Sequence, residues 1–476
     1  MIAIKLALQQ LKFPFHHSFV RHLIINTSNT LKWTRFRDME QKMPPSRDNP
    51  IITKLDTPAF RSIFTPELNV LTSLFRKYNY ELRIAGGAVR DILMGLNPKD
   101  LDFATNATPG EMKKLFDDEG IRILNTKGEK HGTITARIND KANFEITTLR
   151  IDVVTDGRHA DIEFTTDWKL DANRRDLTIN SMFLDFDGQV YDYFFGYDDL
   201  KKKRVTFVGD AATRIQEDYL RILRYFRFYG RIAEAPSMHE DSTIKAIKNN
   251  VEGLERVSGE RIWSEWSKIL EGNFGVELTL KMIECNLTNF IGLPKNPNTE
   301  NFVNICTRAK SKNLILHPVT MISAMLKDSR EVMNMFSRLR WSTYNRELGY
   351  FIVNYRDIEG SPHPLYPFQF LLLGSGKIKD IREYTYEVMK YRGKPELAKQ
   401  FEEWIPPKFP VTGYDLKPHV SHPKLMAPTL HALKEVWLRD NCKTTADDLM
   451  KQVPEIITAL EHKYEPILKK ETNIKK

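Results

Sequence analysis

The pattern of hydrophobic and polar positions divides the chain into two regions. Between residue 60 and about residue 200, short apolar runs of strand length alternate with stretches of helical periodicity. After residue 210 the strand-like runs nearly vanish, and segments of helical length continue to the C-terminus, broken by Pro-rich loops. The pattern therefore predicts the α+β class, with a mixed head followed by an extended all-helical part.

Changes in this pattern also indicate where the domains begin and end. A stretch with several Pro and Asp residues at 41–58 is typical of a linker. The mixed head is expected over 59–205, a first helical domain over 206–290, and further helical domains over 291–476. In the head, strands are expected at 81–85, 101–104, 132–138, 144–149 and 181–186, and helices at 66–78 and 88–94. In the helical part, helices are expected at 214–231, 259–270 and 276–285.

Composition restricts the kind of protein and the kind of partner. Lys and Arg number 71 and Asp and Glu 62, which gives a formal net charge of +9 at neutral pH. Such an excess favours nucleic acid or phosphate partners, although a basic housekeeping protein remains an alternative. No apolar run reaches the roughly 18–20 residues of a membrane span, so no membrane association is expected. The three cysteines are far apart, which argues against a disulfide framework and a zinc site.

The first 40 residues differ from the rest of the chain. Residues 1–37 contain no Asp or Glu but several Lys and Arg, with Leu, Ile and Phe between them. This composition is typical of a mitochondrial transit peptide, and a disordered basic tail is the alternative. We therefore expect a mitochondrial location. Met39 and Met43 could serve as downstream starts, which would give a cytosolic or nuclear form.

A pair of glycines follows a predicted strand and precedes a predicted helix. Without side chains, Gly86 and Gly87 let the backbone approach a phosphate closely, and the first turn of the helix offers amide donors. Arg90, one turn into the helix, can add a charge-assisted hydrogen bond to a phosphate oxygen. Alone, two glycines between a strand and a helix more often make only a turn. Whether these glycines indicate a phosphate-binding site therefore depends on the residues that follow.

Two carboxylates follow the glycines after the predicted helix. In a strand, Asp100 and Asp102 would project from one face, because residues two apart share a face. Adjacent carboxylates repel each other unless a cation neutralises them, and Mg²⁺ prefers hard oxygen ligands. We expect the pair to hold two Mg²⁺ ions, which would activate an attacking hydroxyl and stabilise leaving pyrophosphate. Glu145, on a later predicted strand, is a candidate third carboxylate, and a solvated acidic loop is the alternative for the pair.

Clustered arginines open the segment RRDLTINS. Arg174 and Arg175 would suit a triphosphate, because a guanidinium matches the geometry of phosphate oxygens. The alternative is a solvated charge cluster, in which Asp176 is a helix cap or a partner for the arginines.

A second charged segment lies in the predicted helix 214–231. The surface of this helix is largely apolar, so the charged groups on it need partners or a cleft. They recur at every third position: Asp218, Arg221, Arg224 and Arg227. Asp218 and Arg221 would be neighbours on the helix, and they either form a structural ion pair or act together on a ligand.

Base chemistry makes the second alternative specific. Cytosine and adenine present an amino donor beside a ring-nitrogen acceptor, whereas uracil and guanine present a carbonyl acceptor beside an N–H donor. A carboxylate beside a guanidinium complements C and A and opposes U and G. Asp218 and Arg221 could therefore select C and A without a nucleic-acid template.

The order of these motifs resembles the class II tRNA nucleotidyltransferases, the CCA-adding enzymes of bacteria and eukaryotes. Within the family the chain resembles the animal mitochondrial and cytosolic enzymes. The glycine pair followed by DLD resembles the wider superfamily that includes DNA polymerase β. The resemblance spans roughly residues 60 to 300 and is carried by GGAVRD, DLD, RRDLTINSM, DGQVYDYFFGYDDL and EDYLRILRYFRF. It implies a polymerase-β-like nucleotidyltransferase head followed by a helical neck, body and tail.

The resemblance also implies an activity and a role for each site residue. The activity is template-independent addition of CCA to the 3′ end of tRNA, with CTP and ATP as substrates. Asp100 and Asp102 would be the catalytic metal ligands, and Asp218 and Arg221 the pair that recognises the base. Contacts to the triphosphate and the rest of the nucleotide would come from Gly87, Arg90, Arg175, Arg224 and Arg227.

The remaining expectations from the resemblance concern a loop and the partner. Asp156, Gly157 and Arg158 would belong to a flexible loop that helps the switch from C to A. A polar connecting loop is the alternative. The body and tail at 291–476 would bind tRNA, and no stable protein partner is expected.

Three other functions are compatible with part of this pattern. A bacterial-type poly(A) polymerase shares the RRD and DxD motifs, and the Asp218–Arg221 pair is compatible with adenine. Enzymes that add only CC or only A would also carry the motifs. A non-catalytic RNA-binding protein with a relic transferase fold is the alternative of a different class, against which the intact Asp100 and Asp102 argue.

Overall fold

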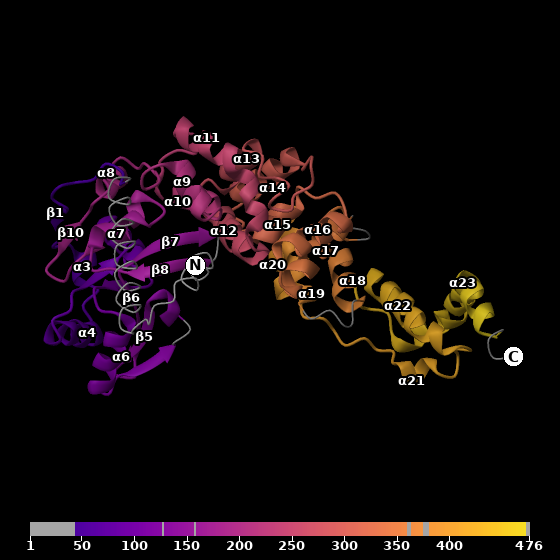
Figure 1. Ribbon diagram of the computed structural model, residues 1–476. Coiled ribbons are helices and arrows are strands. Elements are labelled where there is room, and N and C mark those ends of the chain that lie inside the picture. The colour runs from indigo at the N-terminus through magenta and orange to yellow at the C-terminus, as the bar shows by residue number, and fades with distance from the viewer. Residues whose placement is uncertain (1–42, 126–127, 157–158, 359–362, 375–379, 473–476) are drawn as a thin grey trace, which may run out of the picture. The chain divides into compact units, whose positions relative to one another are not determined.

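The computed structural model describes residues 43–125, 128–156, 159–358, 363–374 and 380–472. The transit peptide expected at 1–40 lies outside these residues. The chain divides into two compact units, residues 1–221 with 232–234 and residues 222–231 with 235–476. The strands of the described residues all belong to the first unit, and the second unit is built from helices (Figure 1). The predicted α+β class is therefore confirmed, and the domain boundaries at 205 and 290 stay predictions.

An eight-stranded sheet forms the centre of the first unit, in the order β1-β10-β9-β2-β3-β6-β5-β4. β3 and β6 pair in parallel, and the other neighbours pair antiparallel. A separate antiparallel hairpin is made by β7 (Arg150–Asp156) and β8 (His159–Phe164). The strands of the sheet are β1 (Ile51–Lys54), β2 (Leu82–Ala85), β3 (Asp102–Thr105), β4 (Arg122–Asn125), β5 (Thr133–Ile138), β6 (Ala142–Thr148), β9 (Phe183–Leu184) and β10 (Gln189–Tyr191).

The linker expected at 41–58 is wrong where β1 forms. Residues Ile51–Lys54 pair antiparallel with β10 at one edge of the sheet, so their backbone groups find partners in β10. The four-residue strand is too short for its pattern to be recognised beside the Pro and Asp residues around it.

The two faces of the sheet carry different side chains. Ile84 and Phe103 lie on a face that helices α4 (Pro66–Lys77) and α6 (Pro109–Asp118) cover, with Phe75 and Phe116 in edge-to-face contact at 6.2 Å between ring centroids. On the opposite face Ala85, Ala104 and Phe183 pack with Trp168 of α7 (Trp168–Asn173). Because side chains alternate along a strand, Asp102 stands on the same face as Ala104.

The other main elements of the described residues are helices. In the first unit these are α3 (Pro58–Arg61), α5 (Gly87–Leu93), α8 (Gly196–Lys201) and α9 (Ala211–Glu217). The helix α10 (Arg221–Ile232) begins in the first unit and continues in the second. The second unit contains α11 (Asp241–Asn250), α12 (Gly259–Glu271), α13 (Gly275–Glu284), α14 (Thr299–Ser311), α15 (Pro318–Ser323), α16 (Ser329–Leu339), α17 (Thr343–Tyr355), α18 (Tyr366–Gly374), α19 (Ile381–Tyr391), α20 (Pro395–Glu403), α21 (Gly413–Leu416), α22 (Pro423–Arg439) and α23 (Ala446–Thr472). In the described part of the chain, no helix combines the length and the apolar character needed to cross a membrane.

The continuous helix expected at 214–231 is wrong at residues 218–220. α9 ends at Glu217, Asp218 is extended with φ −153° and ψ 106°, and α10 begins at Arg221. The Asp218 side chain accepts a hydrogen bond from Leu220 N at 3.2 Å, and its carbonyl accepts one from Arg221 N at 2.9 Å. This local turn competes with the helical hydrogen bonds, as aspartate side chains often do. Asp218 and Arg221 are therefore not neighbours on one helix.

Candidate functional site

The two glycines form the turn between β2 and α5. Gly86 has φ +67°, a conformation that glycine adopts without strain, and its N–H donates to Met182 O at 3.1 Å. A Cβ atom at Gly86 would lie 2.9 Å from Nη1 of Arg175. The absence of a side chain therefore lets the Arg175 guanidinium lie against this turn.

A buried carboxylate holds Arg175 there. Nε and Nη2 of Arg175 donate to Oδ2 of Asp171 at 3.3 and 3.0 Å, and Nη1 donates to Asn180 O at 3.2 Å. Arg174 donates from Nε to the other oxygen of Asp171 at 2.8 Å. Burial acts to raise the pKa of Asp171, but the charges of both arginines outweigh it and hold that pKa below its ordinary value. An ionised Asp171 therefore binds both arginines at neutral pH.

Arg90 is bound inside the protein next to the same loop. Its side chain is buried, and Nη1 donates to Oδ1 of Asn180 at 2.6 Å. Nε and Nη2 donate to Oδ1 of Asp91 at 3.0 and 2.8 Å. Arg90 and Arg175 thus both bind Asn180, one at its side chain and one at its carbonyl. The glycine turn and the RRDLTINS segment are joined into one structure.

The segment DGQVYDYFFGYDDL supports RRDLTINS from behind. A Cβ atom at Gly196 would lie 2.1 Å from Thr178 O, so only glycine permits this approach. Oδ2 of Asp199 accepts hydrogen bonds from the hydroxyls of Thr178 at 2.6 Å and Thr206 at 2.7 Å. Asp192 accepts from three backbone N–H groups in the same segment, including that of Gly196 at 3.0 Å. This segment therefore fixes the position of the arginine-bearing loop.

The two predicted metal ligands lie at the start of β3. The strand begins at Asp102, and Asp100 precedes it at a bend, so the expectation that both aspartates lie in the strand is wrong for Asp100. The pKa of Asp102 is raised, first because nearby protein removes part of its hydration and then because Asp100 is charged; the charge of Arg175 opposes the rise. The two carboxylates thus interact with each other and with Arg175.

Glu145 lies beside Asp102 on the neighbouring strand. The parallel pairing of β3 with β6 sets Asp102 opposite Glu145, and both residues are exposed. Across the residues that the structure describes, no three His, Cys, Asp or Glu side chains gather where they could hold a metal ion. The role of Glu145 as a third carboxylate stays a prediction.

Arg221 is fixed by the residues before the helix break. Nη1 donates to Oε2 of Glu217 at 2.5 Å and to Arg214 O at 3.1 Å, and Nη2 donates to Arg174 O at 3.0 Å. Glu217 also accepts two hydrogen bonds from Arg214, at 2.9 and 3.0 Å. The guanidinium predicted to recognise the base is therefore connected to the RRDLTINS segment through the Arg174 carbonyl.

The other two arginines of α10 belong to the second unit. Arg224 and Arg227 are half-buried between fully buried apolar residues, as the sequence pattern predicts. Nη1 of Arg227 donates to Oε1 of Glu265 at 2.9 Å, and Arg224 and Arg227 lie 5.3 and 4.3 Å from the ring of Phe228. Within this unit, α10 therefore carries two half-buried arginines on one face, and the buried residues around them hold them in place.

The predicted flexible loop is only partly within the described residues. Asp156 is the last residue of β7. Gly157 and Arg158 lie outside the described residues.

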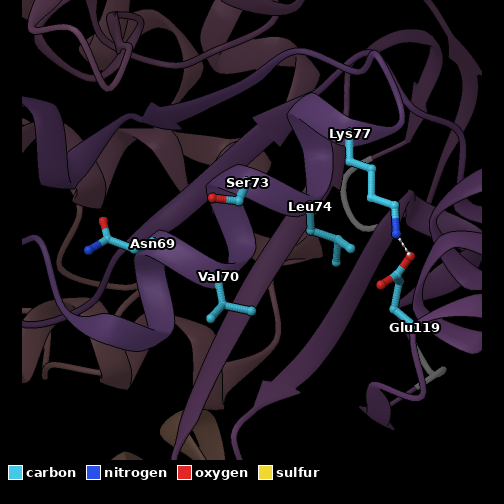
Figure 2. A pocket seen from close by; sticks show the side chains of 6 residues that line it. All are labelled: Asn69, Val70, Ser73, Leu74, Lys77 and Glu119. Atoms are coloured by element: carbon cyan, nitrogen blue, oxygen red, sulfur yellow. Dashed lines mark hydrogen bonds and ion pairs between the residues drawn. The ribbon is translucent and has the colours of Figure 1, made fainter.

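A surface hollow in the first unit is unrelated to this site. It has a volume of about 390 Å³ and lies along α4 and the end of α6, where Lys77 and Glu119 form an ion pair at 2.6 Å. Figure 2 shows its six lining side chains: Asn69, Val70, Ser73, Leu74, Lys77 and Glu119. None of the predicted site residues is among them.

Replacing Gly86 with Ala is expected to damage nucleotide binding more than stability. A Cβ atom would force strain at φ +67° and displace Nη1 of Arg175. The strain should cost about 1–2 kcal/mol, and the displacement should raise KM for the nucleotide about tenfold or more. Thermal unfolding measures the loss of stability, and reaction rates at increasing nucleotide concentration measure KM. Gly95, which also has positive φ but nothing within 4 Å of its added Cβ, provides the control: G95A should cost stability and leave KM unchanged. Equal KM values for G86A and G95A would contradict the prediction.

The first unit has the mixed sheet expected of a nucleotidyltransferase head, and comparison with known proteins agrees. Residues 82–206 match the family model described as "Poly A polymerase head domain". Residues 240–294 match a second model, "Probable RNA and SrmB- binding site of polymerase A".

Comparison with whole proteins identifies the family more narrowly. The chain is 45% identical over 451 residues to "CCA tRNA nucleotidyltransferase 1, mitochondrial" of Mus musculus, covering 94% of this chain and 99% of that protein. It is 49% identical over 408 residues to the Homo sapiens protein of the same name, covering 84% and 92%. The fold also matches the crystal structure of the Bacillus stearothermophilus CCA-adding enzyme in complex with CTP, with a TM-score of 0.65, 22% identity, and coverage of 86% and 100%. The chain belongs to the class II CCA-adding enzymes, a family of tRNA nucleotidyltransferases.

Proposed function

We propose that this enzyme adds C, C and A to the 3′ end of tRNA from CTP and ATP, without a nucleic-acid template. The observation that carries the proposal is the acidic pair Asp100–Asp102 beside Arg175, which is held on the Gly86 turn. The mammalian relatives, whose names state an action on tRNA, match the chain over most of its length.

Asp100 and Asp102 fit a site for Mg²⁺. Partial desolvation and, after it, the charge of Asp100 raise the pKa of Asp102, and a divalent cation would relieve the repulsion between the two carboxylates. When bound there, Mg²⁺ supplies Lewis-acid stabilisation of the phosphoryl group and lowers the pKa of the attacking 3′-hydroxyl. Glu145, opposite Asp102 on β6, is the candidate for an additional ligand.

The remaining residues of the head bind and orient the triphosphate. Arg175 lies against the glycine turn and offers its guanidinium to phosphate oxygens, and the backbone at Gly87 allows close approach. Arg90 was expected to contact the triphosphate directly. Its side chain is 4% exposed, against 17% for Arg175, and its donors reach Asn180 and Asp91, so we assign it the positioning of the turn.

Base selection is assigned to the residues around the helix break. Asp218 would accept from the amino group of C or A, and Arg221 would donate to the ring nitrogen. Asp218 has an extended conformation and belongs to neither α9 nor α10. Arg224 and Arg227 would provide further nucleotide contacts, and the helices at 291–476 would bind tRNA.

The loop residues Asp156, Gly157 and Arg158 are assigned to the switch from C to A. Replacing Arg158 with Ala should reduce the terminal A step more than the two C steps, because a segment that repositions the base can be needed for one nucleotide only. The measurement is the single-step rate on tRNA ending in the discriminator base, in C and in CC. Equal losses at the three steps would contradict this assignment.

Nucleotide addition can be tested directly with these three tRNA substrates. Each is incubated with Mg²⁺ and one labelled nucleotide, and the products are separated by length. The proposal predicts C addition to the first two substrates and A addition to the third, followed by arrest. A growing A tail would indicate a poly(A) polymerase, addition of only C or only A a partial enzyme, and no addition a non-catalytic RNA-binding protein.

The location of the enzyme is proposed from its N-terminus and its relatives. The mammalian relatives are named as mitochondrial, and residues 1–37 are basic and free of acidic side chains. We therefore assign residues 1–40 to mitochondrial targeting. A start at Met39 or Met43 would remove this segment and give a cytosolic or nuclear form.

A further inference from the structure

We infer that Asp171 is a positioning residue of the nucleotide site, which acts by holding the guanidinium of Arg175 at the Gly86 turn. The inference rests on the proposed role of Arg175 as a triphosphate ligand and extends it to a residue that makes no contact with the nucleotide itself. Asp171 lies on α7, three and four residues before the two arginines of RRDLTINS.

The carboxylate of Asp171 is nearly saturated by protein donors. Its side chain is 1% exposed. Oδ2 accepts from Nε and Nη2 of Arg175, and Oδ1 accepts from Nε of Arg174 at 2.8 Å and from the backbone N–H of Arg150 at 3.1 Å. The two-point contact with Arg175 fixes the plane of that guanidinium as well as its position.

This contact leaves one side of Arg175 directed toward the turn. With Nε and Nη2 engaged by Asp171, Nη1 lies at the Gly86 backbone and bonds to Asn180 O. Asp171 therefore sets where the positive charge of Arg175 lies relative to the glycine turn.

The carboxylate supplies two of the three hydrogen bonds described for the Arg175 guanidinium, and the third goes to Asn180 O. Arg174 and Arg175 are adjacent and mostly buried, and both donate to Asp171. Removing the negative charge between them leaves two like charges that repel in a poorly solvated place. Arg175 would then move away from the turn, while its own chemistry is unchanged.

Asp171 also binds the first residue of the β7–β8 hairpin. The donor to Oδ1 is the N–H of Arg150, where β7 begins, and the guanidinium of Arg150 reaches His131 O. The same hairpin carries Asp156 at the far end of β7. The carboxylate of Asp171 thus holds both Arg175 and the first residue of the β7–β8 hairpin, Arg150.

The test compares Asp171→Asn with a control that removes a buried carboxylate elsewhere. Glu387 is buried in the second unit, where it accepts from Thr320 at 2.6 Å and pairs with Lys390 at 2.6 Å. Both D171N and E387Q should lower the melting temperature. D171N alone should raise KM for CTP and for ATP by about tenfold or more, with KM for tRNA unchanged. A purely structural role predicts lost active protein, hence lower kcat at unchanged KM for nucleotide, and this result would overturn the inference.

A double-mutant cycle with Arg175→Ala separates this inference from the proposed function. If Asp171 acts through Arg175, adding D171N to R175A should raise KM for CTP no further. An additive rise would overturn the inference. No effect of R175A alone would instead contradict the role of Arg175 in the proposed function. Should D171N fail to fold, the variant D171N/R174Q removes one buried positive charge as well. It should still raise KM for CTP relative to R174Q alone, and equal KM values would again overturn the inference.

Discussion

Replacing Asp100 or Asp102 with Ala should abolish the addition of both C and A. In the proposed mechanism both steps depend on this one acidic pair, and loss of either carboxylate would remove a ligand of the metal that would stabilise charge on the transferred phosphoryl group. The rate should fall by about a thousandfold or more at each step. Folding should survive, since both side chains are exposed, and partial desolvation first and the charge of Asp100 second raise the pKa of Asp102. Single-turnover rates with CTP and with ATP, together with melting temperatures, measure the effect.

Asp118 provides a matched control for these variants. It is an exposed aspartate at the end of α6, and it belongs to neither the glycine turn nor the RRDLTINS segment. D118A should add C and A at the rate of the unmodified enzyme. If D100A or D102A kept rates within about tenfold of that value, the assignment of the metal site would be wrong.

The second large effect concerns which base is added. Asp218→Ala removes the acceptor for the amino group of C or A and leaves the guanidinium of Arg221 to meet the base alone. Each mismatched donor–acceptor pair costs about 1–3 kcal/mol. C and A addition should therefore fall, while the relative use of U or G should rise by about tenfold or more. The measurement is the ratio of kcat/KM for CTP and UTP in the two proteins.

A structural role for Asp218 predicts a different pair of results. Loss of its hydrogen bond to Leu220 N would destabilise the helix break, and the CTP/UTP ratio would stay constant. Asp210 gives the reference for such an effect, because its side chain caps the same α9 by accepting from Thr213 N at 2.7 Å. D210A should cost about 1 kcal/mol of stability with unchanged base selectivity. If D218A behaved in the same way, Asp218 would not recognise the base.

Local patterns predicted several elements around the candidate site. The glycine pair marked the turn between β2 and α5, because a strand followed by two glycines and a helical pattern has few other structures. The α+β class followed from the change in periodicity near residue 200, and the stripe of arginines on α10 appears with the predicted spacing. The membership of the CCA-adding family, inferred from the order of motifs, is confirmed by the mammalian relatives.

The partners of the site residues could not be predicted in the same way. Arg90 and Arg175 meet at Asn180 through tertiary packing, which no spacing in the sequence encodes. Asp171 did leave a signal, since it precedes the two arginines by three and four residues and could reach both at the end of a helix. The break at Asp218 was missed because the apolar periodicity continues across it, whereas the local hydrogen bonds of the aspartate decide the backbone.

The most direct measurement is the sequence of the 3′ ends that the purified enzyme makes on tRNA lacking CCA, with Mg²⁺ and all four nucleotides present together. When all four nucleotides compete, the protein itself must select each base and must end the addition after the terminal A. The account predicts ends that read CCA and extend no further, with no extension by the D102A variant. Ends that carry A tails, mixed bases or no addition by the unmodified enzyme would contradict it.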